Sequence, residues 1–144
     1  MKTIRTWVYA ILEYQDKIIT IQKTRWPFNG MLDMPWGKIE HYEKHLDGLK
    51  REIFEETGIW EENFEIIELV WVDEEFVEHI WEWQEKQEHI LAIIYRVKIV
   101  WENINLDFIE QNGDAWGLVL IEKNDKIHKK TPILERVLEK IFFK

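Results

Sequence analysis

The sequence predicts an α/β fold, in which a mixed central sheet packs against helices. Segments rich in β-branched and aromatic residues, which favour strands, are interspersed with two segments of helical periodicity. The chain has 144 residues, 46% of them hydrophobic, which suffices for one compact core. Because no repeat or low-complexity linker interrupts the chain, we expect a single domain over residues 1–144.

The chain opens with two strand-like segments, Thr3–Glu13 and Lys17–Lys23, and the polar residues between them predict a hairpin. The next segment, Thr24–Tyr42, contains two of the three prolines and two of the six glycines, which predicts a long loop without regular structure. Long ordered loops in small domains are usually functional. This segment is therefore a candidate part of the site.

A first helix is expected from about Glu43 to Thr57. Leu46, Leu49 and Ile53 form one apolar stripe at helical spacing. Gly58 follows the last helical residue and can take the left-handed conformation that closes a helix.

The rest of the chain predicts strands and a closing helix. Four strand-like segments, with a polar hairpin tip at Gln84–Glu88, are Phe64–Val72, Phe76–Trp83, His89–Trp101 and Trp116–Ile121. Near the end, Thr131 is a capping residue and Pro132 suits the first helical position. Apolar residues then repeat at helical spacing, so we expect the closing helix to face the core.

Charge and composition exclude several functions. Lys and Arg total 19 against 28 Asp and Glu, and the net charge of −9 at pH 7 repels a nucleic-acid polymer. A small anionic substrate would need a local cation, most naturally a bound metal. Without cysteine, the chain has no thiol nucleophile and no zinc–thiolate site. With no signal-peptide pattern and no apolar run near the roughly 20 residues of a membrane span, we expect a cytoplasmic protein and no membrane partner.

Three carboxylates gather on one side of the first predicted helix. Glu52, Glu55 and Glu56 lie three and four positions apart, so they share one arc of the helix. Like charges this close repel one another, and a divalent cation over them relieves that repulsion. Hard oxygen ligands select Mg²⁺ or Mn²⁺, and Mg²⁺ shares its other positions with water and substrate phosphates. A solvated acidic helix face is the alternative.

The residues around the three glutamates have a specific spacing. They follow the pattern G-x5-E-x7-R-E-U-x-E-E-x-G-U, where U is aliphatic, from Gly37 through Glu43 and Arg51 to Ile59. In this pattern the sequence resembles the Nudix (MutT-like) hydrolases. The flanks resemble family segments too, namely Met31–Pro35, Lys38–Glu40 and Asp114–Trp116. The resemblance implies a Nudix-type α/β/α sandwich with a mixed central sheet. It also implies a hydrolase that cleaves a nucleoside diphosphate linked to another group, through attack of metal-activated water on phosphorus.

The resemblance implies a role for each matching residue. Glu52, Glu55 and Glu56 would bind the divalent metal, and Glu52 is the residue expected to orient or deprotonate water. Arg51 would orient the carboxylates by ion pairing. Glu43, at the start of the helix, would support the metal ligands from outside their shell.

Trp36 departs from the family, because most members have there the first of two glycines, whose backbone carbonyl can bind the metal. Tryptophan has a carbonyl as well, but it does not reach the positive-φ conformations of glycine, so the loop geometry is open. Its indole either stacks on a base at the pocket or packs within the loop. A further metal carboxylate would come from Asp114 or Glu110 in a late loop, and solvated loop acids are the alternative.

We therefore expect a metal-dependent pyrophosphohydrolase for a small nucleotide, with nucleoside triphosphates as the first candidates. Asp73–Phe76 has neither the proline nor the tyrosine of members that prefer ADP-ribose or dinucleoside polyphosphates, which disfavours those classes. ADP-ribose or a sugar nucleotide is the alternative to nucleoside triphosphates. A catalytically silent module that binds a nucleotide is a further alternative, which the three glutamates disfavour. Relatives are often dimers, and the aromatic segment Phe76–Trp83 is part of either a homodimer interface or the core.

Overall fold

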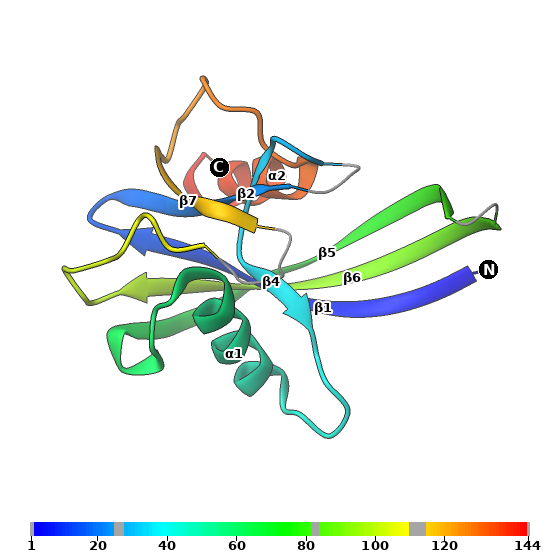
Figure 1. Cartoon of the computed structure of the whole chain (residues 1–144), viewed down its shortest axis with the longest axis horizontal. Helices are drawn as coiled ribbons and strands as arrows, with labels where there is room; N and C mark the ends of the chain where they lie inside the picture. The colour runs from blue at the N-terminus through cyan, green and yellow to red at the C-terminus, as the bar shows by residue number, and fades with distance from the viewer. Residues whose placement is uncertain (1, 25–27, 82–83, 110–114, 144) are drawn as a thin grey trace.

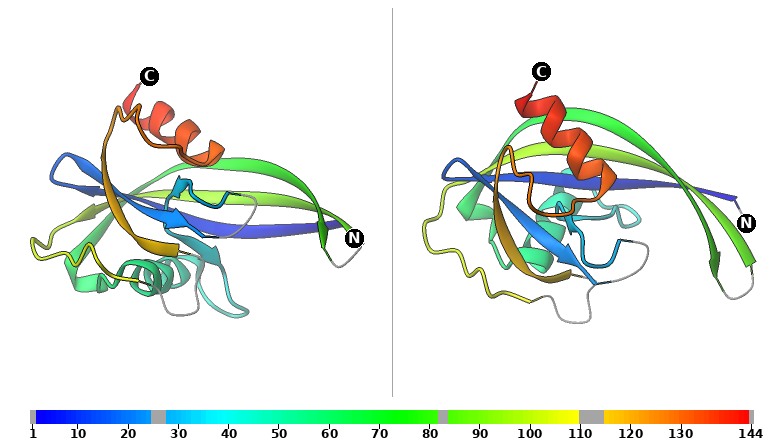
Figure 2. Two further views of the ribbon diagram at one scale, coloured as in Figure 1. Left: turned by 45° about the horizontal axis from the view of Figure 1, so that its top comes forward. Right: turned by 90° about the horizontal axis from the view of Figure 1, so that it is seen from above.

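The structure is a computed structural model of the whole chain, and it describes residues 2–24, 28–81, 84–109 and 115–143. A mixed sheet of seven strands forms the centre of the molecule. Helix α1 (His45–Thr57) covers one face of the sheet, and helix α2 (Pro132–Phe142) covers the other (Figure 1, Figure 2). The predicted α/β/α sandwich is confirmed.

The sheet is built around its first strand. The strands are β1 (Lys2–Tyr14), β2 (Lys17–Lys23), β3 (Leu32–Asp33), β4 (Trp36–Lys38), β5 (Phe64–Trp81), β6 (Gln84–Ile99) and β7 (Ala115–Glu122). Their order is β3-β2-β1-β6-β5, with β4 on β1 and β7 on β2. β1 runs parallel to β6 and antiparallel to β2 and β4, which makes the sheet mixed.

Two predicted strand boundaries are wrong. Phe64–Val72 and Phe76–Trp83 are not separate strands, because β5 continues through Asp73–Glu75. The pairing of β5 with β6 shifts register near Ile66 and near Leu69 without ending the strand. Gln84–Glu88 is not a hairpin tip, because these polar residues are the first part of β6. This end of the hairpin projects beyond both helices (Figure 2), where a strand does not need an apolar face.

The segment Thr24–Tyr42 is not wholly irregular, because it contains β3 and β4. Strands of two or three residues carry no periodicity, so their sequence gives no strand signal. β4 pairs with β1 through Tyr9↔Trp36 and Val8↔Gly37. This short strand fixes the residues before the first helix against the centre of the sheet.

The two helices contribute to separate hydrophobic cores on the two faces of the sheet. Leu49 and Ile53 of α1 are fully buried, whereas Leu46 is 36% exposed. The predicted apolar stripe is wrong at Leu46, because the first turn of α1 lies farther from the sheet than the rest of the helix (Figure 1). Gly58 closes α1 in the left-handed conformation, with φ of 73°, as predicted.

The closing helix is confirmed with its predicted cap. Thr131 accepts the Leu134 N–H on its hydroxyl, and Pro132 is the first helical residue. Four apolar side chains of α2 are buried against the sheet, namely Ile133, Leu134, Val137 and Leu138. No helix in the described part of the chain is long and apolar enough to cross a membrane.

Candidate active site

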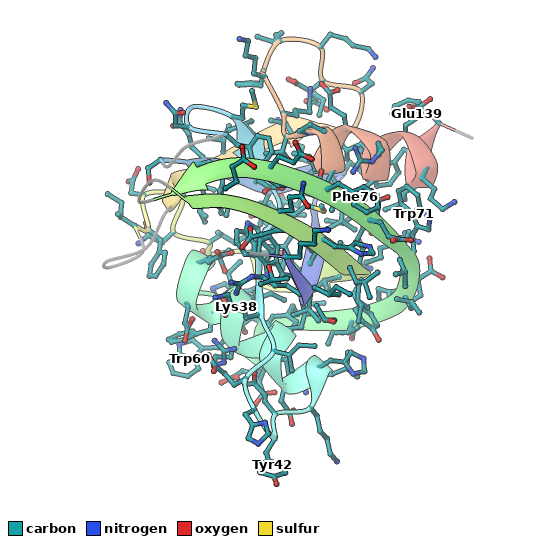
Figure 3. The ribbon with its side chains drawn as sticks, turned by 90° about the vertical axis from the view of Figure 1, so that its right-hand side faces the viewer. Lys38, Tyr42, Trp60, Trp71, Phe76 and Glu139 are labelled. Atoms are coloured by element: carbon teal, nitrogen blue, oxygen red, sulfur yellow. The ribbon has the colours of Figure 1, made fainter. Side chains whose placement is uncertain are left out.

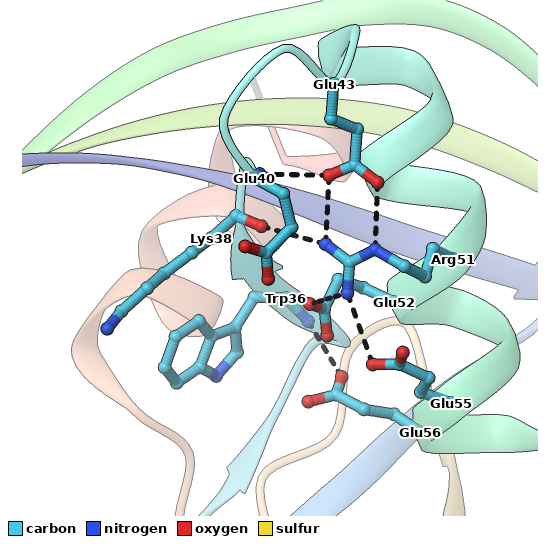
Figure 4. A network of polar contacts seen from close by, with 8 residues as sticks. All are labelled: Trp36, Lys38, Glu40, Glu43, Arg51, Glu52, Glu55 and Glu56. Atoms are coloured by element: carbon cyan, nitrogen blue, oxygen red, sulfur yellow. Dashed lines mark hydrogen bonds and ion pairs between the residues drawn. The ribbon is translucent and has the colours of Figure 1, made fainter.

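Arg51, in the middle of α1, contacts most of the predicted site residues (Figure 4). Its Nε and Nη2 donate to the two carboxylate oxygens of Glu43 at 2.9 and 3.0 Å. Its Nη1 donates to Glu52 Oε1 at 2.7 Å and to Glu55 Oε2 at 3.3 Å. Its Nη2 also donates to the Lys38 carbonyl at 3.0 Å. One guanidinium thus connects Glu43, two residues before α1, with the acidic face of α1 and the end of β4.

Glu43 is a fixed anion that holds Arg51. The hydrogen bonds from Arg51 and from the backbone N–H of Glu40 lower the pKa of Glu43 to about 2. The carboxylate also lies close to Gly48, where a Cβ would approach Glu43 Oε1 to 2.8 Å. A bidentate contact to an ionised carboxylate fixes the plane of a guanidinium. Glu43 therefore sets the direction in which Arg51 presents its Nη1.

Glu52 packs directly against Gly37 of β4. A Cβ on Gly37 would lie 1.9 Å from the Glu52 Cδ, so only glycine leaves room for this carboxylate. Because Gly37 pairs with Val8 of β1, this contact places the Glu52 carboxylate beside the strand that joins β1 at the centre of the sheet. Close approach to a side chain, and not a positive φ, is the reason for glycine here.

Glu56 is buried and accepts a backbone hydrogen bond from Trp36. Its side chain is 4% exposed, and the Trp36 N–H donates to Glu56 Oε2 at 2.8 Å. Trp36 is an extended residue of β4, and the positive-φ residues that the structure describes do not include it. The replacement of the usual glycine by Trp36 therefore requires no strained backbone.

The indole of Trp36 packs within the protein. It stacks on Trp7, with ring centroids 4.2 Å apart, and lies 5.9 Å from Tyr9. The Lys23 Nζ lies 4.5 Å from the centre of the Trp36 ring, a cation–π contact. Of the two alternatives for this side chain, the structure shows packing against neighbouring strands.

The structure brings Glu43, Arg51, Glu52 and Glu55 into one network and joins Glu56 to Trp36 beside it (Figure 4). The candidates Asp114 and Glu110 lie outside the described residues. Two contributors to the network had no signal in the sequence, because the Lys38 carbonyl and the Glu40 N–H are backbone groups. Only the family-like stretch Lys38–Glu40 marked the segment.

The chemistry of the site fits a hard divalent cation. Carboxylate oxygens and a backbone strand converge where Gly37 leaves space, and Mg²⁺ takes one or two carboxylates and completes its shell with water and phosphate oxygens. Within the described ranges, no three Asp, Glu or His side chains are placed to hold one ion together. An ion that needs only one or two of these carboxylates is compatible with this spacing.

Comparison with known sequences and structures identifies the family. The NUDIX domain profile matches residues 1–140 of the chain. A comparison with curated protein sequences gives no match.

Among solved structures, the chain is similar to the MutT NUDIX hydrolase from Burkholderia pseudomallei, with a TM-score of 0.71, 22% identity, and coverage of 96% of this chain and 98% of that one. It is also similar to the MutT protein from Methanosarcina mazei Go1, with a TM-score of 0.70, 17% identity, and coverage of 96% and 93%. A third is the NUDIX domain of Shewanella oneidensis NrtR complexed with ADP ribose, with a TM-score of 0.63, 15% identity, and coverage of 97% and 87%.

These structural similarities agree with the fold described above, and the family match covers nearly the whole chain. The residues of the family pattern lie together at the junction of α1 and β4. The chain therefore belongs to the NUDIX domain family, and it is a Nudix hydrolase, an enzyme that acts on pyrophosphate bonds in nucleoside diphosphate derivatives.

Proposed function

We propose that this chain is an Mg²⁺-dependent pyrophosphohydrolase of a small nucleotide, with nucleoside triphosphates as its first substrate class. The Arg51 network carries the proposal, because it holds Glu52 and Glu55 in place beside the buried Glu56. Carboxylates three and four residues apart on one helix repel one another, and a bound cation offsets that repulsion. With a net charge of −9, a bound metal is also the most natural cation to meet an anionic substrate.

In this proposal Glu52, Glu55, Glu56 and the Trp36 carbonyl are the metal ligands, with one or two of the carboxylates binding any single ion, and Mn²⁺ is an alternative to Mg²⁺. The bound ion supplies polarisation of the phosphoryl oxygens and a lowered pKa for water. Glu52 accepts the proton of the attacking water, and Arg51, which donates to Glu52 Oε1, holds the carboxylate in place. No covalent bond to the enzyme is required.

Arg51 and Glu43 act as positioning residues. The Arg51 guanidinium holds the Glu52 and Glu55 carboxylates, and Glu43 holds Arg51 in turn. Residues that orient metal ligands typically change metal affinity or activity by about 10- to 100-fold when they are replaced.

The test is release of phosphate and pyrophosphate from a panel of nucleoside triphosphates, ADP-ribose, sugar nucleotides and dinucleoside polyphosphates, with and without Mg²⁺. We expect metal-dependent turnover that is lost in Glu56→Gln and retained in Glu139→Gln, a matched change at an exposed glutamate of α2. Turnover without metal, or turnover unaffected by Glu56→Gln, would contradict the proposal.

ADP-ribose or a sugar nucleotide is the second candidate substrate class. It is supported by two structurally similar proteins, the NrtR domain complexed with ADP ribose and a UDP-X diphosphatase. The products of the panel separate these classes. Binding of a nucleotide without turnover of any member of the panel would instead indicate a silent nucleotide-binding module. We further propose a cytoplasmic location, with neither nucleic-acid polymers nor membranes as partners.

A further inference from the structure

One end of the sheet projects from the body of the molecule as a three-stranded arm (Figure 1, Figure 2). We call this part the arm; it consists of Lys2–Thr6 of β1 with residues 74–81 of β5 and 84–91 of β6. The three strands pair in register, so that Ile4 lies beside His89 and His89 lies beside Phe76. Arg136 of α2 contacts Glu75 at the base of the arm, and beyond this contact the arm projects past both helices (Figure 2).

One face of the arm exposes apolar side chains. Ile4 is 71% exposed and Phe76, labelled in Figure 3, is 75% exposed. The Phe76 ring lies 4.7 Å from the ring of His89 on the neighbouring strand. These residues line a shallow hollow of about 410 Å³. Exposed apolar side chains in a row across neighbouring strands are typical of an interaction surface.

The outer edge of Lys2–Thr6 is open. These residues pair with β6 on one side, and on the other side β4 joins β1 only from Trp7 onward. No strand in the described ranges pairs with this outer edge. An open strand edge presents unpaired N–H and C=O groups that can bind another strand.

The opposite edge of the sheet, along β5, is protected. In the body of the sheet two register shifts interrupt β5 between Ile66 and Trp71, and bulges of this kind hinder pairing with a further strand there, whereas within the arm β5 runs without a shift. Glu68, Glu74 and Glu78 also line it, and all three side chains are exposed. By contrast, Lys2–Thr6 contains no acidic residue in a chain of net charge −9. The β1 edge is therefore the one that can accept a partner strand.

We propose that Lys2–Thr6 pairs antiparallel with the same segment of a second copy of this chain, forming a homodimer. With the symmetry axis at Ile4, Lys2 lies opposite Thr6, Thr3 opposite Arg5, and Ile4 opposite its counterpart. No two like charges face each other directly in this register, and Arg5 already has an ion pair with Glu88 at 3.0 Å. The pairing uses all of the open edge Lys2–Thr6 and stops before Trp7, which already pairs with Lys38 of β4.

The pairing joins the two apolar rows across the axis and keeps the acidic strands apart. The two β5 strands would be separated by five strand spacings, about 24 Å. This separation is about three Debye lengths at physiological ionic strength, so repulsion between their carboxylates is screened. The partner strand also lies in line with β4, next to Lys38, whose carbonyl accepts a hydrogen bond from Arg51.

Sedimentation velocity over a wide range of protein concentration tests this proposal. We expect a reversible monomer–dimer equilibrium, and Ile4→Glu should raise the dimer dissociation constant at least about tenfold by placing like charges opposite each other. Ile4 is largely exposed, so the variant should unfold at nearly the wild-type temperature. Ile67→Glu, at a 45% exposed residue of the protected β5 strand, is the matched control and should leave the equilibrium unchanged.

A charge-exchange experiment distinguishes the β1 pairing from other dimers. Ile4→Glu mixed with Ile4→Lys should restore association, because opposite charges then meet at the axis. A wild-type chain that remains monomeric at every concentration would overturn the proposal. A dimer that tolerates Ile4→Glu but dissociates with Ile67→Glu would overturn it as well, since the interface would then lie on β5.

Discussion

The two helices of this enzyme follow different rules. α2 begins with a side-chain cap at Thr131 and a proline, ends with Lys140 in its last turn, and buries a continuous apolar face. α1 has no side-chain cap, since Lys44 occupies that position, and no basic residue in its last turn. It carries Glu52, Glu55 and Glu56 toward the end where the helix dipole disfavours negative charge. Departures from the usual capping and charge preferences of helices are expected at functional sites, and α1 is the helix that carries the candidate site.

α1 remains stable because other contacts offset its unfavourable charges. Leu49 and Ile53 anchor it to the sheet, and Gly58 closes it. Arg51 balances the carboxylates on its exposed face, and Glu56 receives the Trp36 N–H. The stability of α2 is local in origin, whereas that of α1 depends on its neighbours.

The largest effect is expected at Glu52. Glu52→Gln should lower kcat by about 10²- to 10⁴-fold, the usual contribution of a general base, because the amide does not accept the proton of water. The unfolding temperature should not fall, since glutamine fits the space beside Gly37 and removes a like-charge repulsion. Turnover with the best substrate of the panel and thermal unfolding measure the two effects. Equal losses of activity in Glu52→Gln and in Glu139→Gln of α2 would remove the distinction between the helices.

A pH effect is expected where β3 meets the start of α2. Burial raises the pKa of Asp33 from 3.8 to about 7, while Lys23 opposes this shift. The folded protein therefore holds a proton that the unfolded chain has already released, and the free energy of unfolding falls as the pH rises from about 4 to about 7. The loss is at most about 4 kcal/mol, at about 1.4 kcal/mol per pKa unit.

Asp33→Asn should remove this pH dependence. Asparagine keeps the oxygen that accepts from the Met34 N–H and the Thr131 hydroxyl, at 2.8 and 2.9 Å, but does not titrate. We expect the variant to be more stable than the wild type at pH 8. Urea unfolding from pH 4.5 to 8 measures this, and a wild-type free energy of unfolding that is flat over the range would contradict the assignment.

A smaller effect is expected at Arg51. Arg51→Lys should weaken Mg²⁺ binding by about 10- to 100-fold, because an ammonium group does not hold Glu43 and Glu52 at once in a fixed plane. Isothermal titration calorimetry measures the affinity. Lys50→Arg is the matched control, since it exchanges the same two cations at the neighbouring residue, which forms an exposed ion pair with Glu61. An affinity that changes equally in both variants would show that the orientation of the carboxylates by Arg51 is not responsible.

The smallest effect is expected at the cap of α2. Thr131→Ala should lower the free energy of unfolding by about 1–2 kcal/mol and leave kcat unchanged, because it removes the hydrogen bonds to Leu134 and Asp33. Thr131→Ser keeps the hydroxyl and should retain most of the stability. Chemical denaturation of the three proteins, with turnover measured alongside, tests this. A cap variant that loses activity at unchanged stability would place α2 in the site.

Features that depend on neighbours in the sequence could be predicted. The cap of α2, the closure of α1 at Gly58 and the arc of glutamates all follow from spacings within one or two helical turns. The family pattern further predicted that Gly37 and Glu43 belong to the same site as these glutamates. The structure places these residues together, and their roles stay a prediction.

Features that depend on tertiary contacts could not be predicted. β4 is too short to show a periodic pattern of apolar residues. The Lys38 carbonyl that accepts a hydrogen bond from Arg51 is a backbone group, so the identity of residue 38 does not predict this contact. The Asp33–Thr131 hydrogen bond joins residues 98 positions apart. β5 continues through three acidic residues because Asp73 and Glu75 pair with Arg136 of α2 and Glu74 pairs with His89.

The central claim is that the carboxylates of α1 are gathered to bind a divalent cation. Electron paramagnetic resonance with Mn²⁺ tests it directly, by comparing the wild type with Glu56→Gln, which keeps an oxygen for the Trp36 N–H. The account predicts a bound Mn²⁺ in the wild type, an affinity at least about tenfold weaker in the variant, and no loss of thermal stability. An unchanged Mn²⁺ affinity would contradict it and would make the acidic face of α1 a solvated surface.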